Sequence, residues 1–397
     1  MTYDFTTVLD RQGHDIIAAD IIPFPEGKVA EGFSPIPMWI ADMSFPTAPC
    51  ILEALAERLH FPNFGYFREP ERYHRAILDW HRQRKGVCDL DRDCIGYENG
   101  VLGGVSSAIR MLTAPGDKIL LHAPTYVGFT HVLDNIGRVA VHTDLVRDGD
   151  GIWRMDYEDM DRKLKENRIH LAVFCSPHNP TGRVWEREEI EKAMEIYAAN
   201  DCIVISDEIW SDIIMPGFRH IPTQSVSEDA KRRTIAFYAP SKTFSLAGLI
   251  GSYHIVYDPR LRDRLRRESE LTHYNSQNVL SMEALVGAYT KGGAWVDEMC
   301  GVIDGNLRYA CDFIAEHFPG VRVMSSQGTY LLFLDCGDWC REHGVPLREL
   351  LERGIRAGVI WQNGESFFWP DSIRLNLALP FSLLREALDR LEKHAFI

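Results

Sequence analysis

The stretch TIAFYAPSKTFSLAGL, residues 234–249, begins as a strongly apolar run and then reaches Ser241 and Lys242. Such a run is typical of a buried strand, whereas lysine is seldom buried. A buried lysine can extend its charged end to water only where a surface is near. Lys242 directly follows an apolar strand, where such a surface is not expected. We therefore expect Lys242 to have a chemical role at the end of this strand.

Five further apolar runs have the same character and also predict strands. Helical patterns such as residues 186–200 lie between several of them, and this alternation favours a mostly parallel sheet with helices on both faces. The predicted fold class is therefore α/β. The six predicted strands span residues 118–124, 138–143, 170–177, 202–206, 234–240 and 252–257.

The chain of 397 residues is too long for one ordinary core and indicates two domains. Its last part combines amphipathic helices with strand candidates at 329–336 and 372–379, which is typical of a smaller α+β domain. The Pro-rich, irregular start of the chain is expected to pack on that smaller domain. We predict an N-terminal segment at 1–45, a large domain at 46–285 and a small domain at 286–397.

Composition argues against several classes of function. The net charge of −14 argues against general binding to nucleic acid or to an anionic membrane. No apolar stretch is long enough to span a membrane, and the N-terminus lacks the apolar core of a signal peptide. Nine scattered cysteines indicate reduced thiols in a cytoplasmic protein, and fifteen histidines without an HExxH motif give no reason to expect a metal.

Polar or aromatic side chains follow four of the predicted strands. Tyr126, Asn179, Asp207 and Lys242 each come shortly after a strand ends. Because the carboxyl ends of parallel strands meet at one edge of a sheet, these side chains should lie near one another. Taken singly, Asp207 could cap a helix, Asn179 could form a turn and Tyr126 could belong to the core. Together, the four favour a ligand site.

The segment YENGVLGGVSSAIRML, residues 97–112, adds a candidate phosphate site. Its glycines open an amphipathic helix, and the first turn of a helix offers free backbone N–H groups to an anion. The pattern is weak by itself, and it matches neither a Walker loop nor the GxGxxG motif of dinucleotide-binding proteins. A nicotinamide dehydrogenase is therefore disfavoured.

A lysine, a carboxylate, an amide, a flat aromatic ring and a phosphate cradle fit the cofactor pyridoxal 5′-phosphate. The lysine would form a Schiff base, and the carboxylate would keep the pyridine nitrogen protonated so that the ring can accept electrons. The aromatic ring would stack on the cofactor, and the amide would hydrogen-bond the 3-oxygen of the pyridine ring.

Motifs along nearly the whole chain resemble those of the class I/II aminotransferase family of fold-type I pyridoxal-phosphate enzymes. They are, in order, SPHNPTGRVW, SDEIWSD, APSKTFSLAGL and IRLNLALP. The segments YDFTTVLDRQGHDI, MWIADMSFP, FGYFREP and HNPTGRVW resemble the MalY/PatB branch of cystathionine β-lyases and cysteine C–S lyases. The resemblance implies a seven-stranded sheet in the large domain and a homodimer with shared active sites.

The resemblance also implies a role for each matching residue. Those roles are the Schiff base for Lys242, the pyridine nitrogen for Asp207, the 3-oxygen for Asn179, ring stacking for Tyr126, phosphate binding for Val101, Leu102 and Ser241, the neighbouring subunit's phosphate for Tyr66, and the substrate α-carboxylate for Arg374 and Ala41. Arg374 suits its role because a guanidinium binds a carboxylate through two parallel bonds.

Four positions depart from the pattern of the family. Trp210 stands where relatives often have Tyr or His, and it can donate a hydrogen bond to the cofactor but cannot accept one. Ala239 and Ile250 replace a serine and an arginine that often hold phosphate, and Ser44 replaces an aspartate. Phosphate binding should therefore depend on Ser241, Tyr66 and the helix N-terminus.

The expected reaction is α,β-elimination from cystathionine, cysteine or an S-substituted cysteine, giving pyruvate, ammonia and a thiol. An aminotransferase would use the same core residues and is the alternative, while a regulatory protein on this fold is a further alternative. Aromatic residues just ahead of Arg374 in the sequence, and three more in the first part of the chain, could line a side-chain pocket or pack the small domain. These candidates are Phe33, Trp39, Tyr66, Trp361, Phe367, Phe368 and Trp369.

Overall fold

The computed structural model describes residues 2–24, 27–272 and 274–397. The helices run as follows: α1 Ile17–Asp20, α2 Pro49–Leu59, α3 Glu71–Trp80, α4 Val101–Leu112, α5 Val127–Asn135, α6 Tyr157–Asn167, α7 Arg187–Ala199, α8 Glu228–Arg233, α9 Pro259–Thr272, α10 Val279–Lys291, α11 Gly293–His317, α12 Gly337–His343, α13 Leu347–Arg356 and α14 Phe381–His394. Within the described ranges, no helix is both long enough and apolar enough to cross a membrane.

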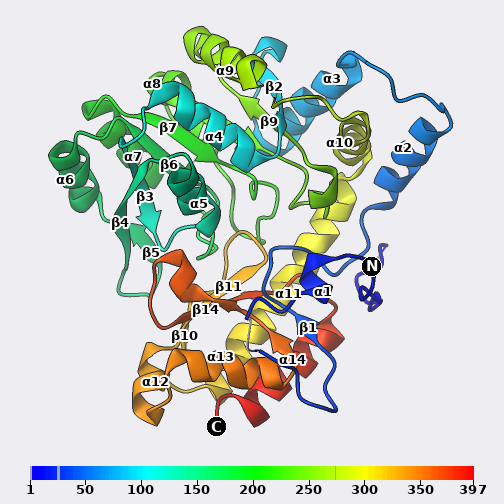
Figure 1. Ribbon diagram of the computed structural model, residues 1–397, viewed down its shortest axis with the longest axis vertical. Coiled ribbons are helices and arrows are strands. Elements are labelled where there is room, and N and C mark those ends of the chain that lie inside the picture. The colour runs from blue at the N-terminus through cyan, green and yellow to red at the C-terminus, as the bar shows by residue number, and fades with distance from the viewer. Residues whose placement is uncertain (1, 25–26, 273) are drawn as a thin grey trace.

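The strands form three sheets, of which the largest has the order β2-β9-β8-β7-β6-β3-β4-β5. The strands of this large sheet are β2 Ile95–Asn99, β3 Lys118–Ala123, β4 Val139–Arg147, β5 Trp153–Met155, β6 Leu171–Cys175, β7 Ile203–Asp207, β8 Thr234–Tyr238 and β9 Gly251–Ile255. The five central strands, from β8 to β4, are parallel, whereas β2, β9 and β5 pair antiparallel. Helices lie on both faces of this sheet (Figure 1).

The predicted α/β class is confirmed, but the large sheet has eight strands and the prediction of seven was wrong. The six apolar runs became β3, β4, β6, β7, β8 and β9. Every residue of β6 and β8 is buried, as expected for strands covered on both faces. The three-residue strand β5 turns back antiparallel along β4, and so short a strand has no periodic pattern to find.

The small sheet has the order β10-β11-β14-β13, and a separate pair joins β1 to β12. Their bounds are β1 Ile36–Pro37, β10 Arg322–Val323, β11 Leu331–Asp335, β12 Val359–Ile360, β13 Gln362–Asn363 and β14 Ser372–Asn376. The N-terminal strand β1 lies beside the C-terminal part of the chain, and α11 extends from the large sheet toward the small one (Figure 1). The division at residues 45 and 285 stays a prediction.

Candidate active site

A cavity of about 270 Å³ lies at the carboxyl ends of β6, β7 and β8, beside the first turn of α4. This is the edge where ligands bind in open α/β sheets. The cavity brings residues from distant parts of the sequence together. It is lined by Ala41, Gly100, Val101, Leu102, Tyr126, Asn179, Asp207, Ile209, Trp210, Ala239, Ser241, Lys242, Ala247, Ile250, Gly251 and Ser252.

Lys242 follows the end of β8 and extends into this cavity. Its Nζ donates a hydrogen bond to the Ala41 carbonyl at 2.8 Å and lies 5.9 Å from the centre of the Trp210 ring. Among the described residues, no carboxylate lies within ion-pair distance of Nζ. Removal from water lowers the pKa of Lys242 to about 8, since desolvation disfavours the charged form. A lysine of this kind can lose and accept a proton near neutral pH.

Two adjacent carboxylates at the end of β7 have opposite electrostatic surroundings. Burial raises the pKa of Asp207 to about 7. Among the described residues, one of its oxygens accepts a hydrogen bond, from the Ile209 N–H at 3.1 Å, and the other accepts none. Burial acts in the same direction on Glu208, but hydrogen bonds from His220 and Tyr238 reverse it and lower the pKa. Asp207 therefore has a free oxygen for a cationic partner in the cavity, while Glu208 is fully engaged elsewhere.

Arg374, on β14, is a buried cation without a carboxylate partner among the described residues. It donates to Asn179 Oδ1 at 3.1 Å and to the Trp39 carbonyl at 2.9 Å, and its Nε is buried with no hydrogen bond. The ring of Phe367 lies 4.6 Å from the guanidinium carbon. Because a buried charge is costly unless it is paired, Arg374 is suited to bind an anionic ligand.

The first turn of α4 borders the other end of the cavity. Gly100, which precedes the helix, has φ +83°, a backbone conformation that glycine adopts without strain. A Cβ atom at Gly104 would lie 2.3 Å from the Phe237 ring, so glycine lets α4 pack directly on β8. The N–H groups of Val101 and Leu102 are in the first turn and have no partner within the helix. They can bind an anion beside Ser241.

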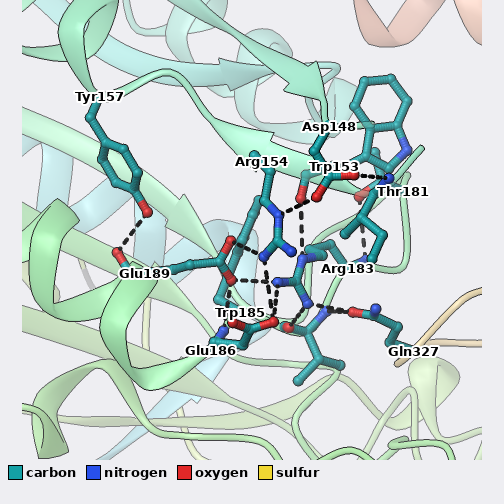
Figure 2. Close-up of polar contacts among 12 residues, drawn as sticks. Asp148, Trp153, Arg154, Tyr157, Thr181, Arg183, Trp185, Glu186, Glu189 and Gln327 are labelled. Carbon is teal, nitrogen blue, oxygen red and sulfur yellow. Dashed lines mark hydrogen bonds and ion pairs between the residues drawn. The ribbon is translucent and has the colours of Figure 1, made fainter. Parts of the chain in front are cut away.

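The loop that carries Asn179 is fixed by the buried guanidinium of Arg183, which Figure 2 shows beside Arg154. Arg183 donates to the Trp153 carbonyl at 3.1 Å, to Gln327 Oε1 at 2.6 Å and to the carboxylates of Glu186 and Glu189. Gln327 also donates through its backbone N–H to the Gly182 carbonyl. Arg183 and Gln327 therefore tie the Asn179 loop to the chain that enters β11.

The segment after β1 contributes residues that the sequence patterns did not single out. The Asp42 side chain accepts a hydrogen bond from Ser245 at 3.2 Å and pairs with Arg11, which also donates to Ser44 at 3.0 Å. This arrangement joins the N-terminal segment to the turn that follows Lys242. Asp42 could have been suspected only from its place next to Ala41 in the motif MWIADMSFP.

Most of the predicted site residues lie around this one cavity. Arg374 lies next to the cavity, bonded to Asn179. Tyr66 is the exception, because its side chain is fully exposed and does not line the cavity of its own chain. The indole N–H of Trp210 makes no hydrogen bond among the described residues. Within the same residues, no cluster of three or more His, Cys, Asp or Glu side chains could hold a metal ion.

Four of the seven aromatic candidates for a substrate pocket divide into two groups, whereas Phe368 packs against His142 and Trp369 against Trp153. Trp361 is fully buried and donates to the Leu351 carbonyl, and Phe33 packs against His394, so neither lies at the cavity. Phe367 contacts Arg374, and the carbonyl of Trp39 accepts from the same guanidinium. Only the second group is placed near the substrate end of the site.

The family to which the chain belongs is shown by its sequence as a whole. A model of that family matches residues 36–391, and the chain belongs to it. The resemblance inferred from the motifs is thereby confirmed.

Within the family, the chain is similar to proteins named cystathionine β-lyase. It is 32% identical to cystathionine β-lyase PatB of Bacillus subtilis (strain 168) over 90% of this chain and 92% of that one. It is 30% identical to protein MalY of Escherichia coli (strain K12) over 97% of both chains. Cystalysin from Treponema denticola, solved with pyridoxal 5′-phosphate, aligns with a TM-score of 0.92 at 32% identity over 99% of this chain and 98% of its own.

Proposed function

We propose that this chain is a pyridoxal-phosphate-dependent C–S β-lyase that acts on L-cystathionine, cysteine or an S-substituted cysteine. The observation that carries the proposal is the buried Arg374, which has no carboxylate partner among the described residues, beside a cavity that also contains Lys242 and Asp207. Relatives named cystathionine β-lyase and a solved structure named C–S lyase, from Staphylococcus hominis, support elimination as the reaction.

The residues of the cavity fit pyridoxal 5′-phosphate. The uncommitted oxygen of Asp207 suits the protonated pyridine nitrogen, and the flat ring of Tyr126 suits stacking. The first turn of α4 and Ser241 suit the phosphate, and Lys242 suits covalent attachment. The cofactor, when bound, draws the electron pair left on the substrate Cα into its ring.

The protein's own residues then orient the substrate and move the proton. Arg374 binds the α-carboxylate through its guanidinium, which fixes Cα relative to Lys242. Lys242, whose pKa is lowered by burial, accepts the Cα proton as a neutral amine. Departure of a thiolate from Cβ completes the elimination, and addition of water to the remaining three-carbon unit gives pyruvate and ammonia.

The experiment that tests the reaction is a panel of amino acids without any keto acid, assayed in parallel for pyruvate, ammonia and thiol. We expect S-substituted cysteines to release all three products in equal amounts. Amino acids without a leaving group on Cβ should release none and serve as the control. Absence of pyruvate from every sulfur amino acid would contradict the proposal.

An aminotransferase is the second candidate, since Lys242 and Arg374 would serve it equally and the family model bears that name. It predicts product only when a keto-acid acceptor is added. It also predicts loss of the visible absorbance of the bound cofactor when an amino acid is supplied alone. The two readouts separate the candidates in one set of samples.

We also propose a cytoplasmic homodimer in which Tyr66 reaches the cofactor phosphate of the neighbouring subunit. Tyr66 is fully exposed in the single chain, and Phe61 and Phe64 beside it are more than half exposed. Exposed aromatic residues in one segment are typical of a protein–protein interface. All nine cysteines are unpaired, which agrees with a reducing compartment.

A further inference from the structure

The Lys242 amine and Asp42 lie close together but do not form an ion pair. The Lys242 Nζ donates to the Ala41 carbonyl at 2.8 Å. That carbonyl belongs to the peptide bond between Ala41 and Asp42, so the Asp42 Cα lies about 6 Å or less from Nζ. A carboxylate so near a buried lysine favours the charged form of the amine and attracts it. The absence of an ion pair between the two, in the part of the chain that the structure describes, therefore needs an explanation.

The Asp42 carboxylate is occupied by two other groups. One oxygen accepts a hydrogen bond from Ser245 at 3.2 Å, and the other pairs with the Arg11 guanidinium. Ser245 comes three residues after Lys242 and has φ +57°, a backbone conformation that is uncommon outside glycine. Both carboxylate oxygens are thus engaged, and neither bonds Nζ.

Arg11 is held beside Asp42 by a second contact. The other terminal nitrogen of its guanidinium donates to Ser44 Oγ at 3.0 Å, and its side chain is only 11% exposed. The Ser44 N–H donates in turn to the Ala378 carbonyl at 2.8 Å. Because the N–H groups of a guanidinium form a rigid fork, two bonds fix the direction in which Arg11 meets the carboxylate.

The backbone around Ala41 is fixed independently of Arg11. The carbonyls of Trp39, Ile40 and Asp42 accept side-chain hydrogen bonds at 2.9, 2.8 and 2.7 Å, the first from Arg374 and the other two from Asn376. Loss of Arg11 would therefore release the Asp42 side chain and leave the Ala41 carbonyl in place.

The charges that face Lys242 come from three side chains. Removal from water is the largest effect and lowers the pKa of Lys242 to about 8, while Asp42 and Asp207 favour the charged amine and Arg374 opposes it. Tyr330 is a further titratable group near Asp42, but burial raises its pKa well above the usual range, so it carries no charge. An Asp42 carboxylate released from Arg11 would add to the stabilisation of the charged amine.

We propose that Arg11 is a positioning residue that binds the Asp42 carboxylate and so prevents it from forming an ion pair with the Lys242 amine. Lys242 is then bonded to a neutral carbonyl and loses its charge near neutral pH. The proposal rests on the proposed function only where a neutral Lys242 is taken to accept the Cα proton, and it holds for elimination and transamination alike.

The test measures the pH at which Lys242 becomes reactive in the full-length, cofactor-free protein. Trinitrobenzenesulfonate reacts with the uncharged form of an amine, and peptide mapping by mass spectrometry gives the rate at Lys242 itself. Arg11→Gln and Arg11→Met both remove the guanidinium charge. Each should raise the midpoint of the pH dependence by about one unit or more, as for a lysine that gains a carboxylate neighbour. Arg11→Lys retains a cation and should keep the midpoint of wild type.

Two further proteins separate the effect of charge from the effect of lost packing. The double variant Arg11→Gln/Asp42→Asn removes both charges of the pair and should return the midpoint to that of wild type. The matched control is Arg147→Met, which breaks an ion pair of similar burial with Asp335. Neither Arg147 nor Asp335 lines the cavity, so this variant should lower the melting temperature and leave the midpoint unchanged.

The possible results distinguish this role of Arg11 from the proposed function. An unchanged midpoint in Arg11→Gln and Arg11→Met, a raised midpoint that persists in the double variant, or an equal rise in Arg147→Met would overturn the proposal. In the holoenzyme, the pH at which kcat rises should also move upward in Arg11→Gln. The expected shift in labelling, without pyruvate from any sulfur amino acid, would support this role of Arg11 and overturn the proposed function alone.

Discussion

At the scale of single residues, burial sets the protonation behaviour of the site. Asp207 and Lys242 lose water as the cavity forms, and this moves their pKa values toward each other, to about 7 and about 8. Both side chains thus titrate near neutral pH. Binding of a cofactor or a substrate can therefore change the charge of Asp207 and of Lys242. The neighbouring Glu208 shows the contrast, because its hydrogen bonds keep it ionised.

Asp207→Asn should change how the stability of the cofactor-free protein depends on pH. Because folding raises the pKa of Asp207 from 3.8 to about 7, the folded state holds more protons than the unfolded state between these values. The free energy of unfolding therefore falls as pH rises through this window, by about 4 kcal/mol from this group. Urea unfolding at pH 4.5 and 7.5 should show a smaller fall in the Asn variant, and equal falls in both proteins would contradict the assignment.

At the scale of elements, the loop between β6 and α7 shows what the sequence can predict. The motif SPHNPTGRVW indicated a turn and singled out Asn179, and the structure places both at the cavity. Helix α7 could be predicted because Glu186 and Glu189 form a capping box before an apolar stripe. The contact between Arg183 and Gln327 could not, because its partners are 144 positions apart in sequence.

The same limit explains the other residues that sequence reasoning missed. Asp42 lies at the site because β1 pairs with β12, more than 300 residues away. Strand β2 was not predicted from the sequence. It forms the edge of the large sheet by pairing with β9, which is distant in the sequence. Tertiary contacts of this kind have no local pattern.

Arg183→Met should disturb the Asn179 loop, and Arg154→Met provides the matched control. Both arginines contact Glu186 and Glu189 (Figure 2), but only Arg183 also bonds Gln327. Removing the buried guanidinium should cost about 3 kcal/mol of stability, and removing the partly exposed Arg154 about 1 kcal/mol or less. Only Arg183→Met should raise KM for the amino acid, as measured by steady-state kinetics. A raised KM in both variants, or in neither, would contradict a positioning role for Arg183.

At the scale of the whole molecule, one chain does not complete the predicted site. The cavity has no cation near the first turn of α4 among the described residues other than Lys242, because Ile250 lies there with φ +62°. Ala239 and Ile250 predicted from sequence that few side chains of this chain would bind the phosphate. Tyr66 of a second copy was predicted to provide a further phosphate contact. The structure shows that Tyr66 is exposed.

Tyr66→Phe should therefore weaken cofactor binding without changing the fold. Loss of a hydrogen bond to phosphate should raise the Kd for pyridoxal 5′-phosphate by roughly tenfold or more, as measured by absorbance titration of the cofactor-free protein. Tyr309→Phe, on α11, is the control and should leave this Kd unchanged. Sedimentation should show a dimer for all three proteins. A monomeric wild type, or an unchanged Kd in Tyr66→Phe, would contradict the shared site.

We propose that Lys242 removes the Cα proton and that a thiolate then leaves from Cβ. The most direct measurement follows pyruvate and free thiol from L-cystathionine in the absence of any keto acid, for wild type and Lys242→Ala. We predict equal amounts of the two products from wild type, and a rate at least about 1,000-fold lower in the variant. Product that appears only when a keto acid is added, or a variant as fast as wild type, would contradict elimination by Lys242.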